Sequence, residues 1–271
     1  MSETDTRTTK VLFREWRAGD SQAGQIMAQR FADWYYAIAT SRLGEAGGAS
    51  ACEQACAQFG EGVVEVTESR ALVPWAHDVI TKLLSASGSR VMDGDEPNAY
   101  TGNQHPKLLL VKARAAMPEE VKLLEVAYRR GSTSDEVDAL SAPLGGNPLG
   151  ILKARYRVKG WMKGNLGVPF DVTPENPVLD RAPLPLYESG KMGSPEEEVS
   201  FEHWMISDID LCRDIAEFAH FAIALRGGLP SDAEAQAQAS SRSTAQSEIV
   251  DSAQLEQNQG CMAKIMAMFG G

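Results

Sequence analysis

The 271-residue sequence has few cysteines, few aromatic residues and no long apolar run. Four cysteines are too few for a disulfide framework, which favours a reducing compartment. No 18 consecutive residues are apolar, so no membrane-spanning helix is expected. The polar segment 1–10 has no apolar stretch of the kind that export signals carry. We therefore expect a cytoplasmic protein.

Sequence signatures of catalysis and of metal binding are also missing. The chain has no Walker loop, no nucleophile elbow and no dinucleotide fingerprint. Cys52 and Cys56 lie four residues apart, but no histidine lies near them in the sequence, which favours buried thiols over a metal site. His203, Cys212 and His220 match no zinc-ligand spacing. We expect no enzymatic activity, no metal and no cofactor.

What the sequence does contain is helical periodicity. Apolar residues recur three and four positions apart, while strand patterns are nearly absent, so we predict an all-α fold. Gly44 is expected to end the first long helix. The predicted helices cover residues 21–43, 49–59, 71–84, 118–128, 134–140, 149–162 and 194–225, the last as one helix or two.

Proline, glycine and small polar residues divide the chain into parts. Two small helical domains are predicted, followed by a C-terminal helical extension and a tail that is poor in bulky apolar residues. The predicted parts are a helical domain over 10–85, a linker over 86–106, a helix-turn-helix domain over 107–163, a Pro-rich extended connection over 164–193, a helical extension over 194–228, a disordered linker over 229–259 and an amphipathic tail over 260–271.

The charge of the chain is unevenly distributed. In total, 37 acidic and 26 basic residues give a net charge of -11, which by itself argues against a nucleic-acid partner. Residues 107–163, however, hold 11 basic and 6 acidic side chains, whereas residues 164–271 hold 6 basic and 17 acidic ones. One segment is therefore basic enough to bind a polyanion, and the acidic excess belongs to the C-terminal part.

Residues 118–162 follow the order of a helix-turn-helix: a helix, a turn at Gly131, a short helix, a turn at Gly145–Gly146 and a basic helix. Every charged residue of 149–163 is basic, and Lys153 and Arg157 lie one helical turn apart. Basic side chains on one helix suit contacts with phosphates and base edges, although a solvated basic surface is the common alternative. The candidate DNA-contacting residues are Asn147, Lys153, Arg155, Arg157, Lys159 and Lys163.

Pro148, Gly150, Lys153 and Arg155 have the spacing P-x-G-x-x-K-x-R, preceded by the segment PEEVKLLEVAY. Together they resemble region 4 of an RNA polymerase sigma factor of the extracytoplasmic-function type. The segment LFREWRAGDSQAGQIMAQRFADWYYAIATSRLGE resembles the first half of region 2 in the same family. This resemblance covers residues 10–163 and implies a transcription regulator that binds core RNA polymerase and promoter DNA.

The family's next helix docks on the polymerase and carries an acidic D-x-x-Q-E pattern. Here the glutamine is kept and the aspartate is lost, which leaves Glu53 and Gln54 as the implied polymerase-binding residues. The helix containing Trp75 occupies the place of the promoter-melting helix, yet it has little of the basic and aromatic character that unpaired bases require. Two hypotheses follow: a sigma-like regulator, or a sigma-derived scaffold for protein–protein interaction that no longer opens promoters.

The acidic C-terminal part has two interpretations of its own. Residues 194–225 are apolar enough to pack on the sigma-like body or to form a dimer. Alternatively, their acidic surface masks the basic helix, so that the extension inhibits DNA binding. The tail places apolar residues on one helical face, which predicts docking to a partner protein or to the chain's own core. These tail residues are Met262, Ile265, Met266 and Phe269.

Overall fold

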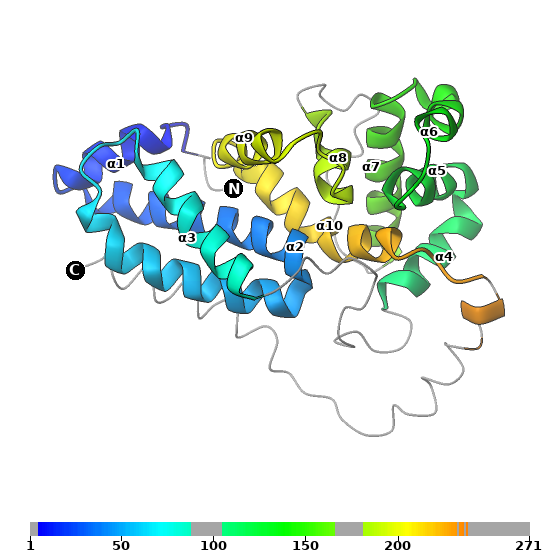
Figure 1. Ribbon diagram of the computed structural model, residues 1–271, viewed down its shortest axis with the longest axis horizontal. Helices are drawn as coiled ribbons and strands as arrows, with labels where there is room; N and C mark the ends of the chain where they lie inside the picture. The colour runs from blue at the N-terminus through cyan, green and yellow to red at the C-terminus, as the bar shows by residue number, and fades with distance from the viewer. Residues whose placement is uncertain (1–4, 88–104, 166–180, 232, 236, 238–271) are drawn as a thin grey trace. The chain divides into compact units, whose positions relative to one another are not determined.

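The computed structural model describes residues 5–87, 105–165, 181–231, 233–235 and 237 (Figure 1). Within these ranges every regular element is a helix, which confirms the all-α fold. The chain divides into two compact units. Of the described residues, those of 5–87 and 196–217 form the N-terminal unit, and those of 105–195 and 218–237 form the second unit. No helix in the described ranges is long and apolar enough to cross a membrane.

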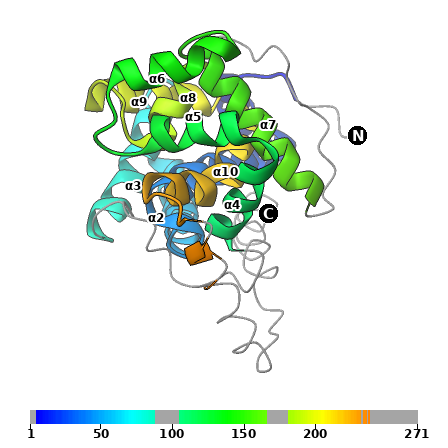
Figure 2. The same cartoon turned by 90° about the vertical axis from the view of Figure 1, so that its right-hand side faces the viewer.

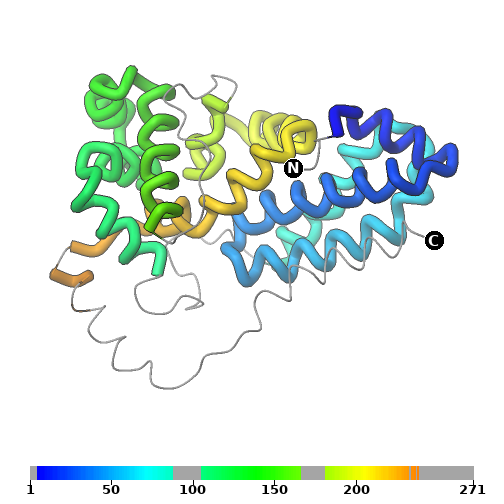
Figure 3. Tube along the Cα trace, turned by 180° about the vertical axis from the view of Figure 1, so that it is seen from behind, coloured from blue at the N-terminus to red at the C-terminus, as the bar shows by residue number. Residues whose placement is uncertain are grey.

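The N-terminal unit is built around one long helix that reverses its direction. Its elements are α1 (Thr9–Arg17), α2 (Ser21–Gly62), the 3-10 helix η1 (Val63–Glu65), α3 (Leu72–Ala86), α9 (Pro195–Met205) from Glu196 on, and the first half of α10 (Ile209–Arg226). Gly44 interrupts α2 with φ 74° and ψ -177°, a conformation essentially restricted to glycine. The two arms of α2 therefore run antiparallel (Figures 1 and 3), and the predicted stop at Gly44 is confirmed.

Close packing joins the two arms of α2. A Cβ atom on Gly48 would lie 2.7 Å from the Thr40 Cα, so only glycine fits this approach. The rings of Phe31 and Phe59 lie across the arms with their centroids 4.4 Å apart. Aromatic pairs at such distances add to the burial of their apolar surface. The hairpin thus forms most of the core of the N-terminal unit.

Helix α9 packs into the N-terminal unit through a buried carboxylate. Glu202 is fully buried, accepts a hydrogen bond from Arg42 at 2.6 Å and lies 2.7 Å from His77 Nε2. The Trp34 indole N–H donates to the Glu202 carbonyl oxygen at 2.6 Å. Residues 194–228 therefore do not form one separate extension: α9 and the first half of α10 belong to the N-terminal unit, and the rest of α10 belongs to the second unit.

The second unit has its own apolar core. Its elements are α4 (Pro106–Ala116), α5 (Pro118–Tyr128), α6 (Ser134–Ser141), the 3-10 helix η3 (Ala142–Leu144), α7 (Leu149–Asn165), α8 (Leu184–Ser189) and the second half of α10. The fully buried Leu110 and Leu124 pack in one cluster with Val158, Phe218 and Leu225. The core therefore draws on α4, α5, α7 and α10.

The Pro-rich connection over 164–193 differs from its predicted extended form. Residues 184–189 form the helix α8, with Leu184 and Tyr187 fully buried. Proline is tolerated in the first turn of a helix because the N–H it lacks has no partner there, so Pro185 permits α8 to form. Burial of its apolar residues explains why this short segment is ordered.

The cysteines that the structure describes, Cys52, Cys56 and Cys212, are buried and form no disulfide within the described ranges. The Sγ atoms of Cys52 and Cys56 lie 3.9 Å apart, and the Cys52 thiol donates to the Ala32 carbonyl oxygen. Burial raises the pKa of the Cys212 thiol far above its usual value. No group of three metal-ligating side chains occurs within the described ranges. The interpretation of Cys52 and Cys56 as buried thiols is thus confirmed.

Candidate nucleic-acid interface

Helices α5, α6 and α7 follow one another in the helix-turn-helix order that the sequence predicts (Figure 2). Gly131, with φ 75°, lies in the turn between α5 and α6. Thr133 then caps α6: its hydroxyl accepts from the Glu136 N–H, and the Glu136 carboxylate accepts from the Thr133 N–H. Such a reciprocal capping box fixes where a helix begins. It gives α6 a defined first residue although the helix is only 8 residues long.

The turn between α6 and α7 depends on three glycines. Gly145 and Gly146 have φ angles of 110° and 79°, which side-chain-bearing residues rarely adopt. Gly150 lies against the end of α6, where a Cβ atom would come within 2.6 Å of the Ser141 carbonyl oxygen. The close approach of α7 to α6 therefore requires a residue without a side chain at position 150.

One stripe of α7 is less buried than the rest of the helix. It contains Leu149, Lys153, Arg157 and Trp161, which are half-buried, and the exposed Gly164. These residues recur at intervals of four and three, so they share one face. This stripe is the part of α7 that could meet a nucleic acid, and two of its members are basic.

The basic residues of the stripe have defined positions. The Lys153 ammonium lies beside Gly145 in the turn that precedes α7. Arg157 pairs with Glu120 of α5 at 3.0 Å, yet 40% of its side chain remains exposed. Lys163 is half-buried in the last turn of α7. Asn147 is exposed, and its amide donates to Asp138 of α6 at 3.1 Å.

Arg155 and Lys159, in contrast, are buried in the unit. Arg155 is fully buried and Lys159 is 4% exposed. A side chain enclosed in this way cannot reach a phosphate or a base edge in this structure. These two candidates do not fit a role in DNA contact, and the sequence pattern misplaced them because it treats every charged residue of a helix as facing solvent.

Arg155 instead belongs to a buried polar network. Glu188 of α8 receives two hydrogen bonds from the Arg155 guanidinium, at 2.5 and 2.8 Å, and a third from the Tyr128 hydroxyl at 2.5 Å. The guanidinium also lies over the Phe218 ring, 4.4 Å from its centroid. Arg226 donates to the Glu188 carbonyl oxygen at 3.1 Å. The network links α5, α7, α8 and α10, and Glu188 is its centre.

No pattern in the sequence pointed to Glu188 or Lys191. Lys191 donates to the Ala127 carbonyl oxygen at 2.7 Å and to the Ser132 hydroxyl at 2.9 Å, and burial lowers the pKa of its amine. Both residues therefore attach the segment after α8 to α5 and to the turn that follows it. The available signal was the apolar run Leu184–Tyr187 inside a Pro-rich segment, which marks a part of the connection that can pack.

The residues that the resemblance assigns to region 2 lie in the N-terminal unit. Glu53 and Gln54 are exposed on the second arm of α2, and the Gln54 amide donates to the Ser50 hydroxyl at 3.3 Å. Trp75 of α3 lies against the ring of Phe59, with a centroid separation of 5.5 Å, and His77 is buried against Glu202. The tail residues Met262, Ile265, Met266 and Phe269 lie outside the described residues.

Comparison with known proteins gives no relative: no family model, no curated protein and no solved structure matches the chain.

Proposed function

We propose that the protein is a sigma-factor-like transcription regulator that contacts promoter DNA through α6 and α7. The observation that carries the proposal is the α5–α6–α7 arrangement, with Lys153 and Arg157 on the less buried stripe of α7. A helix in this position of a helix-turn-helix presents its outward residues to the major groove. Asn147, exposed before the start of α7, and Lys163, half-buried in its last turn, are further candidate contacts.

The charge of this segment supports a polyanionic partner. Residues 107–163 carry a net charge of +5 within a chain of net charge -11. Arg157 forms an ion pair with Glu120. Because its side chain is 40% exposed, it can also reach a phosphate oxygen. Contacts of this type release counterions from the nucleic acid, so the affinity for DNA should fall steeply as the salt concentration rises.

The experiment compares two double variants that remove the same charges. Lys153→Ala with Arg157→Ala removes the proposed contacts, whereas Lys122→Ala with Arg130→Ala removes two exposed cations of α5 and of the turn after it. We expect the first variant to bind duplex DNA about tenfold or more weakly, measured by fluorescence anisotropy at two salt concentrations, and to show a smaller salt slope. If both variants lose the same DNA affinity, the binding is general electrostatic attraction, and the proposal is overturned.

Binding to core RNA polymerase is part of the same proposal, with Glu53 and Gln54 as contacts. Both side chains are exposed on the second arm of α2, where a partner can reach them. A pulldown with core polymerase tests this directly. We expect retention by the wild-type chain and a clear loss with Glu53→Ala and Gln54→Ala, and no retention of the wild-type chain would contradict it.

If the acidic C-terminal part inhibits DNA binding, the inhibiting segment must be shorter than the whole of 164–271. Glu188 pairs with Arg155 inside the second unit, and Glu198 and Glu202 pair with Arg42 in the N-terminal unit. Removal of 164–271 would therefore destroy both cores. Truncation before residue 238 keeps α8, α9 and α10 and still removes the acidic residues Glu248, Asp251 and Glu256. If these residues mask α7, the truncated chain should bind DNA more tightly, and unchanged binding would exclude masking by them.

A scaffold that no longer opens promoters is the second candidate function. The burial of His77 and the contact of the half-buried Trp75 with Phe59 favour it, since a melting helix needs aromatic and basic groups free to hold unpaired bases. Promoter opening on a supercoiled template, followed with a single-strand-specific probe, distinguishes the two candidate functions. A sigma-like regulator should open DNA together with core polymerase, whereas a scaffold should bind its protein partners without opening it.

A further inference from the structure

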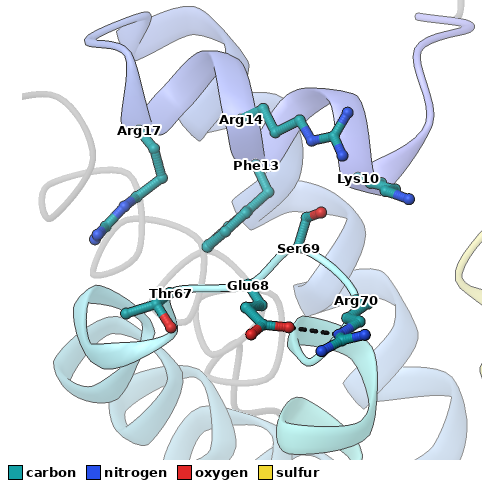
Figure 4. Close-up of a pocket in the computed structure, with 8 residues that line it drawn as sticks. All are labelled: Lys10, Phe13, Arg14, Arg17, Thr67, Glu68, Ser69 and Arg70. Carbon is teal, nitrogen blue, oxygen red and sulfur yellow. Dashed lines mark hydrogen bonds and ion pairs between the residues drawn. The ribbon is translucent and has the colours of Figure 1, made fainter.

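A basic hollow lies in the N-terminal unit between α1 and the segment that leads into α3. Its volume is about 450 Å³, and Figure 4 shows the residues that line it. Lys10, Arg14 and Arg17 come from α1, and Arg70 comes from the opposite side, next to the Ser69 hydroxyl. Phe13, which is 2% exposed, forms the apolar floor. Two separate elements therefore contribute cations to the lining of one hollow.

The three cations of α1 lie on one face because they are spaced by four and three residues. Arg17 donates to the Val64 carbonyl oxygen at 2.9 Å, which ties the end of α1 to η1 on the other side of the hollow. The side chains of Lys10 and Arg14 form no ion pair or hydrogen bond with any residue that the structure describes. Like charges one turn apart on a helix repel each other unless an anion lies between them.

The acidic side chains nearby are engaged elsewhere. Glu15 of α1 pairs with Arg7 at 2.6 Å, and Asp20 accepts hydrogen bonds from the N–H groups of Gln22 and Ala23 at the start of α2. Glu68, the one acidic residue that lines the hollow, forms its ion pair with Arg70. The lining therefore keeps a net positive charge of three, from four cations and one carboxylate.

The position of Lys10 is unfavourable for helix stability alone. It lies in the first turn of α1, which contains no acidic residue, and a cation there opposes the helix dipole. Arg14 and Arg17, in the last turn, are where the dipole favours cations. A residue placed against a local preference is expected where a ligand supplies the compensating charge.

We propose that this hollow binds a small phosphate-bearing molecule of the size of a nucleoside diphosphate. Guanidinium groups bind phosphate oxygens through paired hydrogen bonds, and the Lys10 ammonium and the Thr67 and Ser69 hydroxyls add further donors. The volume falls in the range of about 300–1,000 Å³ that is common for small-molecule sites. The site is independent of the proposed DNA contacts, which lie on α7 in the second unit.

A small ligand fits this geometry better than a nucleic-acid strand. A phosphate backbone requires cations that follow it along a groove. Here the cations of α1 and Arg70 line a single open hollow over the buried Phe13 (Figure 4). A short single-stranded oligonucleotide therefore serves as a competing probe in the test.

The test is isothermal titration of the full chain with inorganic pyrophosphate, adenosine diphosphate and sulfate. We expect both phosphate compounds to bind more tightly than sulfate. Lys10→Gln combined with Arg14→Gln should weaken their Kd by at least about tenfold, the loss expected for removing charged hydrogen bonds. If the diphosphate binds no better than pyrophosphate, the phosphates alone are recognised, and if it binds better, the nucleoside is recognised as well; both results support the site.

The matched control is Lys82→Gln combined with Arg130→Gln, which removes two exposed cations outside the hollow. This variant should keep the wild-type Kd, and circular dichroism should show both double variants to be folded. Three results would overturn the proposal: no binding of either phosphate compound at about 1 mM, equal weakening in the two variants, or binding of the oligonucleotide alone.

Discussion

Arg155 and Glu188 form a buried, two-pronged ion pair across 33 positions of sequence, with hydrogen bonds of 2.5 and 2.8 Å and side-chain exposures of 0% and 1%. The Tyr128 hydroxyl donates a third hydrogen bond to the same carboxylate. A buried charge is tolerated only when its hydrogen-bonding capacity is met in this way. The pair therefore joins α8 to α7, and it makes Arg155 a structural residue.

Arg155→Ala should destabilise the protein strongly. It leaves the Glu188 carboxylate buried without its cation, which costs about 3–5 kcal/mol of unfolding free energy. Denaturant unfolding followed by circular dichroism measures the change. The matched control Arg130→Ala removes an exposed arginine and should stay within about 0.5 kcal/mol of the wild type. A loss for Arg155→Ala no larger than that of the control would contradict the structural role.

Gly150→Ala should separate α6 from α7. Its Cβ atom would lie 2.6 Å from the Ser141 carbonyl oxygen, so one of the two helices must shift, at a cost of about 1–3 kcal/mol. Gly164→Ala, in the same helix, meets no atom within 4 Å and should be neutral or stabilising by up to about 1 kcal/mol. Thermal unfolding of the two variants gives the comparison. If the two variants have the same melting temperature, the close approach of α7 to α6 at Gly150 does not contribute to stability.

Gly44→Ala should weaken the hairpin of α2. A side chain at φ 74° and ψ -177° is strained, with a cost of about 1–3 kcal/mol, because this region is open essentially to glycine alone. We expect a lower midpoint of denaturant unfolding. Hydrogen exchange should also rise first in residues 40–48, where the two arms meet. An unchanged midpoint would mean that the reversal adopts another backbone conformation at little cost.

The stability of the N-terminal unit should decrease when the pH falls from about 7.5 to about 5.5. Burial, followed by the charge of the neighbouring His77, lowers the pKa of His203 below its usual value near 6.5. Its buried Nε2 atom has no hydrogen-bond partner in the part of the chain that the structure describes. The unfolded chain then binds the proton more readily, so this contribution is complete above the unfolded pKa and is lost as the pH falls toward the folded one. His203→Gln should flatten the dependence of the unfolding free energy on pH, and parallel curves for variant and wild type would refute this.

Local signals in the sequence were enough for most of the helices, whereas α1, α4 and α8 had no predicted helix. The periodicity of 21–43 and 118–128, the reversal at Gly44 and the turn at Gly131 depend on backbone preferences and on which face of a helix is apolar, and both can be read within one helical turn. The run Glu196–Glu198 also follows a local rule, since acidic residues favour the first turn of a helix, where α9 has them.

Only the tertiary structure decided which charged residues of α7 are available to a ligand. Arg155 and Arg157 are two positions apart and look alike in the sequence, yet the first is enclosed by Glu188 and Phe218 and the second is partly exposed beside Glu120. The difference comes from residues far along the chain: α8 packs because Leu184 and Tyr187 are buried, and that packing brings a carboxylate to Arg155. The sequence by itself determined most of the helices through short-range interactions, whereas the burial and pairing of each charge depended on long-range packing, since a charge enters a core only where another part of the chain supplies its partner.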